Sequence, residues 1–152
     1  MADNIRQQVI NKIDERLKTI RIINGYETDA GKNVFHYKEN PFEQLNLPCI
    51  EYRDISDSPE YLSFGLFLHV IMLEIRAYAS GVNADKTIRK IRADIEKVIG
   101  TDLTWDGLAE DTRQINISQD IDLEHKEKKN AGILFSVAIE YVSEGWSPYL
   151  EE

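Results

Sequence analysis

The stretch LSFGLFLHVIMLEIRAYA, residues 62–79, decides the fold because it carries the longest apolar run in the chain. Apolar residues occupy positions of both parities through its middle, so neither face of a strand built from it should contact much water. We expect this strand at the centre of a sheet or beneath another subunit. Side chains alternate along a strand, which places Glu74, Arg76 and Tyr78 on one face. The apolar run is too short to cross a membrane as a helix.

Shorter strands are predicted on both sides of this stretch. Residues 34–37, VFHY, are aromatic and β-branched, and residues 49–54, CIEYRD, alternate apolar and charged side chains. The stretch SDSPEY, residues 56–61, is expected only to break the strand before it. Two later strands, joined by the charged residues 124–131, are predicted as antiparallel neighbours. The residues expected to share a face are Ile115, Ile117, Ile121 and Leu123 in the first and Ile133, Phe135, Val137, Ile139 and Tyr141 in the second.

Two amphipathic helices are predicted from apolar residues that recur every three or four positions. The first covers about residues 3–23, with Asp3 as its cap and Asn24-Gly25 as its stop, where glycine tolerates a left-handed backbone. The second runs from a cap at Asn83 or Asp85 to about Ile99, with Gly100 as its stop. Its opposite face is either a solvated face with ion pairs between turns or a docking surface for an acidic partner; it carries Lys86, Arg89, Lys90, Arg92 and Lys97, with Asp94 and Glu96 among them.

These elements define the expected fold class. The order of helix, two or three strands, helix and two strands predicts an α+β fold, with a mostly antiparallel sheet of about four to five strands and two helices packed on one face. A chain of 152 residues is the size of one ordinary domain, so a single domain over residues 1–152 is expected.

Composition narrows the classes of function. The formal net charge is −9 and acidity is concentrated in the second half of the chain, so tight binding to DNA phosphates is not expected. Cys49 is the only cysteine, which excludes an intrachain disulfide and gives no sign of an oxidising compartment. The first ten residues lack the apolar core of a signal peptide, and we expect a cytoplasmic protein without a membrane segment.

Local motifs for catalysis or metal binding are weak. Gly25 and Gly31 are one residue too far apart for a phosphate-binding loop, and Asn33 stands where its serine or threonine should follow Lys32. The three histidines, His36, His69 and His125, lack the spacing of metal ligands and are interpreted as structural or surface residues. Turn chemistry accounts for the acidic residues that imitate a calcium loop, which are Asp102, Asp106, Glu110 and Asp111. We expect no enzyme, no metal and no cofactor, although a dispersed active site would leave no local signature.

The order of elements resembles a known family. The chain begins with an amphipathic helix, followed by GYETDAGKNVF at residues 25–35, a proline-containing connection and LPCIEYRD at residues 47–54. The long apolar strand, a capped helix and a closing β-hairpin come next. This order resembles that of the tail terminator proteins of long-tailed bacteriophages, of the lambda minor tail protein U type. The resemblance covers nearly the whole chain as an order of elements. Its most specific pieces are the turn from Thr28 to Gly31 before Val34 and the Leu47-Pro48 entry into the next strand.

The resemblance implies a structural role in a virion tail that is assembled in the host cytoplasm. Such proteins form a ring, commonly a hexamer, that caps the tail tube, ends its polymerisation and offers the surface that joins the head. The implied partners are further copies of the chain, the tail tube protein and the head–tail connector protein. DNA would pass through the ring without specific binding, because an acidic lining repels it.

Two groups of residues are candidates for this role. The candidate subunit interface consists of apolar residues, an ion pair and two aromatic residues near the C-terminus, and comprises Phe64, Phe67, Glu74, Arg76, Tyr78, Trp146 and Tyr149. The two C-terminal aromatic residues either clip onto a neighbour or pack back on their own sheet. The candidate functional loop is interpreted as a structural hairpin in which Asp29 accepts backbone hydrogen bonds and Gly31 adopts a conformation closed to bulkier residues; it comprises Thr28, Asp29, Gly31 and Lys32.

Two alternatives stay open at the level of sequence. A head-completion or neck connector protein has a similar size, and it differs in whether it blocks tube growth. A small enzyme or ligand-binding domain would instead have a deep pocket with polar residues from separate strands, and its stability would respond to metabolites or metals.

Overall fold

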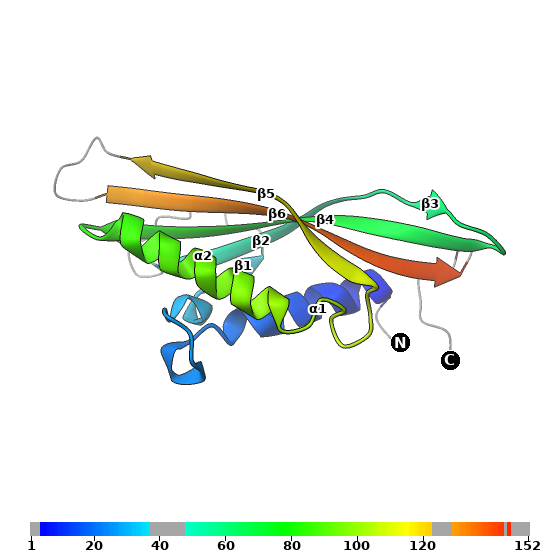
Figure 1. Ribbon diagram of the computed structural model, residues 1–152, viewed down its shortest axis with the longest axis horizontal. Coiled ribbons are helices and arrows are strands. Elements are labelled where there is room, and N and C mark those ends of the chain that lie inside the picture. Colours follow the sequence, from blue (N-terminus) through cyan, green and yellow to red (C-terminus); the bar gives the residue numbers. More distant parts are fainter. Residues whose placement is uncertain (1–3, 37–47, 123–128, 145, 147–152) are drawn as a thin grey trace.

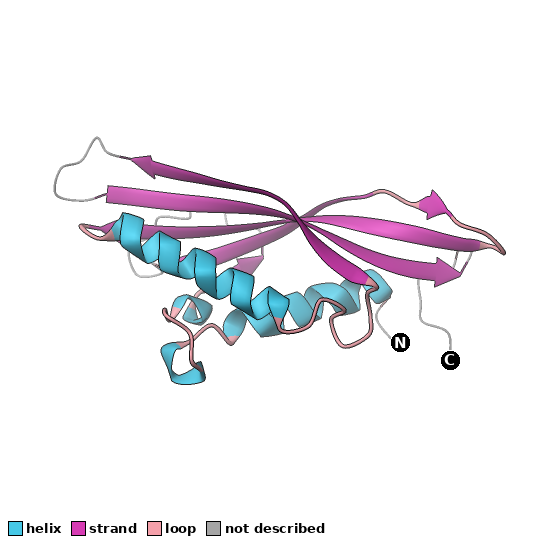
Figure 2. Ribbon diagram, in the orientation of Figure 1, coloured by secondary structure: helices cyan, strands magenta, loops and turns pink. Residues whose placement is uncertain are grey.

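The computed structural model describes residues 4–36, 48–122, 129–144 and 146, in which two α-helices lie against one face of an open six-stranded sheet (Figures 1 and 2). The strands are β1 (Val34–His36), β2 (Cys49–Asp57), β3 (Glu60–Tyr61), β4 (Leu66–Gly81), β5 (Asp111–Asp122) and β6 (Lys129–Glu144). They are arranged in the order β1-β2-β4-β6-β5, and β3 pairs with one end of β4. Every pair is antiparallel except β1 with β2. The predicted α+β class is confirmed.

The central position of β4 is confirmed, because it pairs with β2 on one edge and with β6 on the other. One of its faces is buried within the single chain, as expected, whereas the other is only half-buried there. Ile71, Leu73 and Ile75 are buried against the helices, whereas the residues between them are only half-buried. The two helices cover a single face of the sheet, so the second face of β4 has no helix of the described residues upon it.

The sheet has one strand more than expected, and the extra strand is β3. It lies within the stretch that was expected only to break β2, and the chain turns back after it so that Tyr61 pairs with Phe67. This turn, at residues 63–66, also moves the start of the long strand from the expected residue 62 to Leu66.

Helix α1 (Ile5–Lys18) ends earlier than predicted. Asn4 caps its start by accepting a hydrogen bond of 2.8 Å from the Gln7 backbone amide, while the predicted cap lies outside the described residues. At its end the Thr19 hydroxyl donates to the Arg16 carbonyl, and the chain continues into a separate 3-10 turn, η1 (Ile22–Asn24). Gly25 has the predicted left-handed backbone, with φ of 90°, but it closes η1 instead of α1.

Helix α2 (Ala84–Gly100) covers the predicted range, and Asn83 occupies the cap position without a capping hydrogen bond from its side chain. Gly100 does not stop the helix as predicted, because it is the last helical residue and Thr101 follows with a right-handed backbone. Its apolar stripe packs on the faces of β4 and β6 to form the core, and the predicted shared face of β6 is confirmed. The buried residues of that face are Ile133, Phe135, Val137, Ile139 and Tyr141.

A β-bulge corrects the prediction for β5. Register shifts between Gln114 and Asn116, so Ile115 is left out of the pairing and its side chain is 53% exposed. Ile117 packs against the core as expected, because the bulge reverses the alternation between these two positions. Leu123 lies outside the described residues.

Candidate interaction surface

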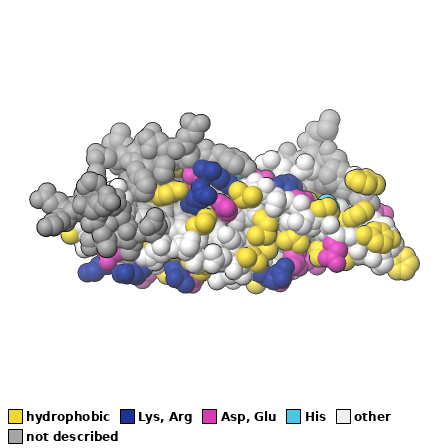
Figure 3. Space-filling view, turned by 90° about the horizontal axis from the view of Figure 1, so that it is seen from above, with side chains coloured by type: hydrophobic (Ala, Val, Ile, Leu, Met, Phe, Trp, Pro, Cys, Tyr) yellow, Lys and Arg dark blue, Asp and Glu magenta, His cyan; other side chains and the backbone are white. Residues whose placement is uncertain are grey.

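Five apolar side chains gather at one end of the sheet, and we call them the aromatic tip: Tyr61, Leu62, Phe64, Phe67 and Trp146 (Figure 3). The Phe67 ring lies 5.7 Å from the ring of Tyr61 and 6.0 Å from that of Trp146, measured between centroids. Phe64 is 96% exposed and Trp146 is 97% exposed. Clustered exposed aromatic residues are typical of a surface that binds another protein.

The turn that carries Phe64 has an unfavourable backbone. The Leu66 amide donates to the Ser63 carbonyl at 3.0 Å, and both residues between them have positive φ, 52° at Phe64 and 78° at Gly65. Two positive φ angles belong to a type of hairpin turn in which asparagine and glycine are the favoured residues. A phenylalanine in this conformation is uncommon and costs conformational energy. The fold therefore holds an aromatic ring in water at a position where a small polar residue would be more stable.

A second group, which we call the charge ladder, lies on the face of the sheet opposite the helices and comprises Glu51, Arg53, Glu74 and Arg76. Glu51 pairs in register with Arg76, and Arg53 pairs with Glu74, so each charge faces an opposite charge across the strands. Within strands, Arg76 donates to Glu74 at 2.7 Å and Arg53 contacts Glu51. The ladder is half-buried except at Glu51, which is 1% exposed.

This face is partly desolvated around Glu51 and Tyr78. One carboxylate oxygen of Glu51, Oε2, accepts no hydrogen bond from the described part of the chain. Burial raises the pKa of Tyr78, and the nearby negative charge of Glu51 acts in the same direction. Because Tyr78 follows Glu74 and Arg76 on the same face, these three predicted interface residues do lie together.

The predicted interface residues are thus divided between two places. Phe64, Phe67 and Trp146 belong to the aromatic tip, whereas Glu74, Arg76 and Tyr78 lie on the outer face of the sheet. Tyr149 is outside the described residues. Tyr61, Leu62, Glu51 and Arg53 were missed, although the spacing of Glu51 and Arg53 on β2 repeats that of Glu74 and Arg76 on β4 and could have indicated the ladder.

A chain of polar contacts runs along the helix-side face beyond α1. His69 Nδ1 lies 3.1 Å from an Asp57 oxygen, and His69 Nε2 lies 2.8 Å from the Ser143 hydroxyl. Asp57 also accepts a hydrogen bond of 3.2 Å from Tyr141 and lies 3.4 Å from the guanidinium of Arg6. Burial raises the pKa of Tyr141 to about 12, so its phenol keeps the proton that it donates. The connectivity is that of a Ser-His-Asp triad.

The loop from Thr28 to Lys32 is not a hairpin, which corrects the prediction. Residues Ala30–Lys32 form a 3-10 turn, η2, and the following strand β1 pairs in parallel with β2. Asp29 accepts a backbone hydrogen bond of 2.9 Å, from the Ile22 amide, as predicted. The hydrogen bond from Ile22 lowers the pKa of Asp29. Lys32 is the exposed member of the loop and lies 3.7 Å from Asp29.

Gly31 is required for a different reason from the one predicted. Its backbone is not left-handed; instead, a Cβ atom at this position would lie 2.6 Å from the Ile20 carbonyl oxygen, 2.7 Å from that of Leu17 and 2.8 Å from that of Lys18. The Gly31 amide donates to the Ile20 carbonyl at 2.8 Å. The loop therefore packs directly on the backbone at the end of α1.

Asp94 was placed on the solvated face of α2, and this is wrong. It is 2% exposed and accepts three hydrogen bonds from the loop: 2.9 Å from the Glu27 amide, 2.9 Å from the Thr28 amide and 2.6 Å from the Thr28 hydroxyl. A carboxylate that replaces water with three donors stabilises the loop against α2. Of the candidate functional loop, Thr28 and Gly31 are therefore buried structural contacts.

The remaining charged residues of α2 form ion pairs between turns or are exposed, in agreement with the interpretation of a solvated face. Arg92 contacts Glu96 at 3.1 Å and Arg89 contacts Asp85 at 3.5 Å, each one turn apart. Lys97 donates to the Gly25 carbonyl and lies over the Tyr26 ring. Lys86, Arg89 and Lys90 are exposed on the first turns of the helix.

The acidic loop after α2 is held by turn chemistry, as expected. Asp102 accepts from the Thr104 hydroxyl and from the backbone amides of Thr104 and Asp106, and these bonds keep its pKa well below its usual range. Arg16 pairs with Asp102 at 2.9 Å and lies over the ring of buried Trp105. No group of three potential metal ligands is found among the described residues.

No protein-family model matches the chain, and no curated protein matches it. In the described parts of the chain, neither helix has the length and apolar character needed to cross a bilayer.

Proposed function

We propose that this chain is a structural tail terminator of a phage or prophage, which forms a ring on the tail tube, ends tube polymerisation and presents the surface that joins the head. The observation that carries the proposal is the aromatic tip, where Phe64 is held in water on a strained turn. Residues with strained backbone cluster at functional sites in proteins. A protein that acts by binding copies of itself and a tube has a direct use for such a surface.

The outer face of the sheet supports the same proposal. Its charge ladder is already half-buried, and opposite charges alternate across the strands. Such a face can meet a complementary surface with little further desolvation of unpaired charge. The net charge of −9 agrees with a ring through which DNA passes without sticking.

Two measurements test this function. The first is the mass of the protein in solution by light scattering, for which we expect a closed ring, with six subunits as the expected number. The second is growth of tail tubes from purified tube protein, which the chain is expected to stop. A head-completion or neck connector protein would form an assembly but leave tube growth unaffected, and this outcome would replace the proposal by that alternative.

Replacing Phe64 by asparagine is expected to separate assembly from stability. Asparagine tolerates positive φ, so the monomer should gain about 0.5–1 kcal/mol in free energy of unfolding. Loss of the exposed ring should raise the concentration needed for assembly by about tenfold or more. Urea unfolding and light scattering measure the two effects. Phe64→Tyr keeps both the ring and the strain and serves as the control; equal assembly of the asparagine variant and the wild type would contradict the role of the tip.

A small hydrolase is the second candidate, because Ser143, His69 and Asp57 have the connectivity of a catalytic triad. In that reaction Ser143 would attack an acyl carbon while His69 takes its proton. Ser143 is only 4% exposed, and Asp57 already contacts Arg6 and Tyr141. We therefore expect these polar contacts to stabilise the fold and not to catalyse a reaction. A fluorophosphonate probe is therefore expected to leave the protein unlabelled. Labelling that disappears in Ser143→Ala would favour the hydrolase.

A further inference from the structure

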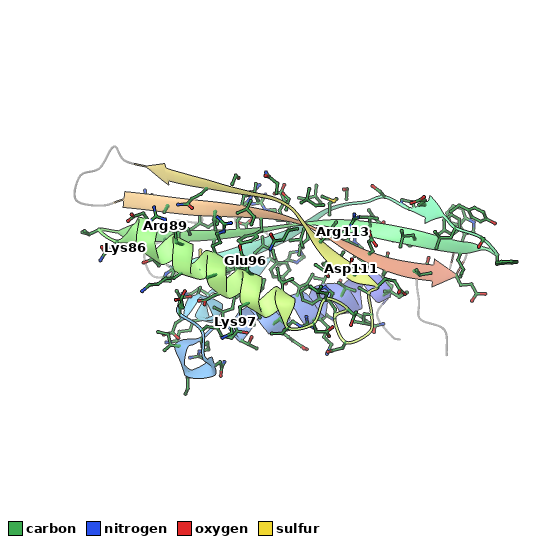
Figure 4. The ribbon with its side chains drawn as sticks, in the orientation of Figure 1. Lys86, Arg89, Glu96, Lys97, Asp111 and Arg113 are labelled. Carbon is green, nitrogen blue, oxygen red and sulfur yellow. The ribbon has the colours of Figure 1, made fainter. Side chains whose placement is uncertain are left out.

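The aromatic tip and the basic start of α2 lie at opposite ends of the long axis of the molecule (Figures 1 and 4). Two acidic residues flank the tip: Glu60 precedes Tyr61, and Glu144 pairs in register with Leu66 at the turn. Both side chains are exposed. At the other end, Lys86, Arg89 and Lys90 are exposed, and Arg89 lies 3.5 Å from Asp85, so the cluster keeps an excess of positive charge.

These two surfaces are complementary in charge and in chemistry. The face of an aromatic ring carries partial negative charge and attracts lysine and arginine. The acidic residues beside the tip add full negative charges to the same surface. A tip placed on the start of α2 would bring its rings and carboxylates against the cations of the helix.

Contacts between identical surfaces are disfavoured by the same charges. Two tips in contact would bring Glu60 and Glu144 of both copies together, and two helices would bring their lysines together. Like charges across an interface raise its free energy, whereas opposite charges direct the partners to each other. A contact between different surfaces is also the kind that repeats around a ring when its rotation closes.

We infer that the occupant of the aromatic tip is a second copy of this chain, seated through the first turns of its α2. This inference rests on the proposed ring and names the two surfaces that join neighbouring subunits. The alternative interpretation of the basic face of α2, a docking surface for an acidic partner, then applies to the first turns of the helix, and the partner is the tip of the next subunit. Each subunit contributes one tip and one helix, so every copy has two neighbours.

Two blocked variants test this contact when they are mixed. The tip-blocked variant combines Phe64→Asn with Trp146→Ser, and the helix-blocked variant combines Lys86→Glu with Lys90→Glu. All four positions are exposed, so the folded state should be unaffected, which circular dichroism checks. Each variant alone is expected to be monomeric by sedimentation. An equimolar mixture retains one intact tip and one intact helix per pair, so we expect dimers and nothing larger.

The control variant reverses two charges on exposed residues outside the contact, with Lys18→Glu and Arg21→Glu, and should assemble like the wild type. Assembly of either blocked variant alone at the wild-type concentration, or a mixture that stays monomeric, overturns this contact and leaves the ring itself standing. A wild-type protein that is monomeric in solution also overturns it. The tube-growth measurement then decides the proposed function separately.

Discussion

Replacing Gly31 by alanine is expected to lower the free energy of unfolding by about 3 kcal/mol, because a methyl group has no room at this position. The added methyl carbon would lie 2.6–2.8 Å from three carbonyl oxygens, which belong to the backbone of Leu17, Lys18 and Ile20. Backbone cannot rotate away as a side chain can. The loop would have to move off the end of α1 and give up the hydrogen bond from Gly31 to Ile20. Urea unfolding followed by circular dichroism measures the change.

Gly100→Ala is the matched control for this substitution. Gly100 is the last residue of α2, and nothing lies within 4 Å of the position that its Cβ would take. Alanine has a higher helix propensity than glycine, so this variant should be as stable as the wild type or more stable by about 0.5–1 kcal/mol. If Gly31→Ala were equally harmless, the close packing of the loop on α1 would be wrong.

Replacing Asp94 by alanine is the second substitution with a large expected effect, also about 3 kcal/mol. It leaves the amides of Glu27 and Thr28 and the Thr28 hydroxyl without their acceptor, and the two Thr28 donors are buried. Unpaired buried donors destabilise the folded state because they had water in the unfolded chain. The loop should also exchange its amide hydrogens faster, which hydrogen exchange at Glu27 and Thr28 would measure.

The comparison variants for Asp94 lie on the same helix. Asp94→Asn keeps one acceptor oxygen and should lose roughly half as much stability. Glu96→Ala removes a partly exposed carboxylate whose pairing with Arg92 contributes at most about 0.5 kcal/mol. An Asp94→Ala variant no less stable than Glu96→Ala would show that the buried contact contributes nothing.

Periodic patterns predicted most of the fold. The strands β4 and β6 and the helix α2 are long, so each offers many positions at which apolar and polar residues agree with one period. The departures are local. A single extra residue at Ile115 reverses which side chains face the core, and the Thr19 hydroxyl and Gly31 amide end α1 although apolar residues continue to Ile20. The pairing of β5 with β6 and the hydrogen bond from Gly31 to Ile20 join separate segments, and hydrophobic periodicity does not contain them.

The residues of the candidate interaction surface were predicted only in part. Aromatic residues such as Phe64 and Trp146 can be picked out in a sequence as candidates for an interface, because large apolar side chains are unfavourable in water. The sequence did not reveal that Phe64 and Gly65 would share a turn with positive φ, nor that β3 would bring Tyr61 beside Phe67. The division of the expected interface into a tip and a charge ladder also needed the register of β2 against β4.

By itself, the sequence determined that this chain builds one apolar layer between two helices and a β4-centred sheet, because side-chain period and hydrophobic burial are local properties of each segment. Only the tertiary structure decided that Asp94 is buried, that Gly31 is needed for space and that the tip and the basic start of α2 lie at opposite ends. Those facts depend on which segments meet in space. A carboxylate on a helix is solvated or buried according to the donors that a distant loop brings to it.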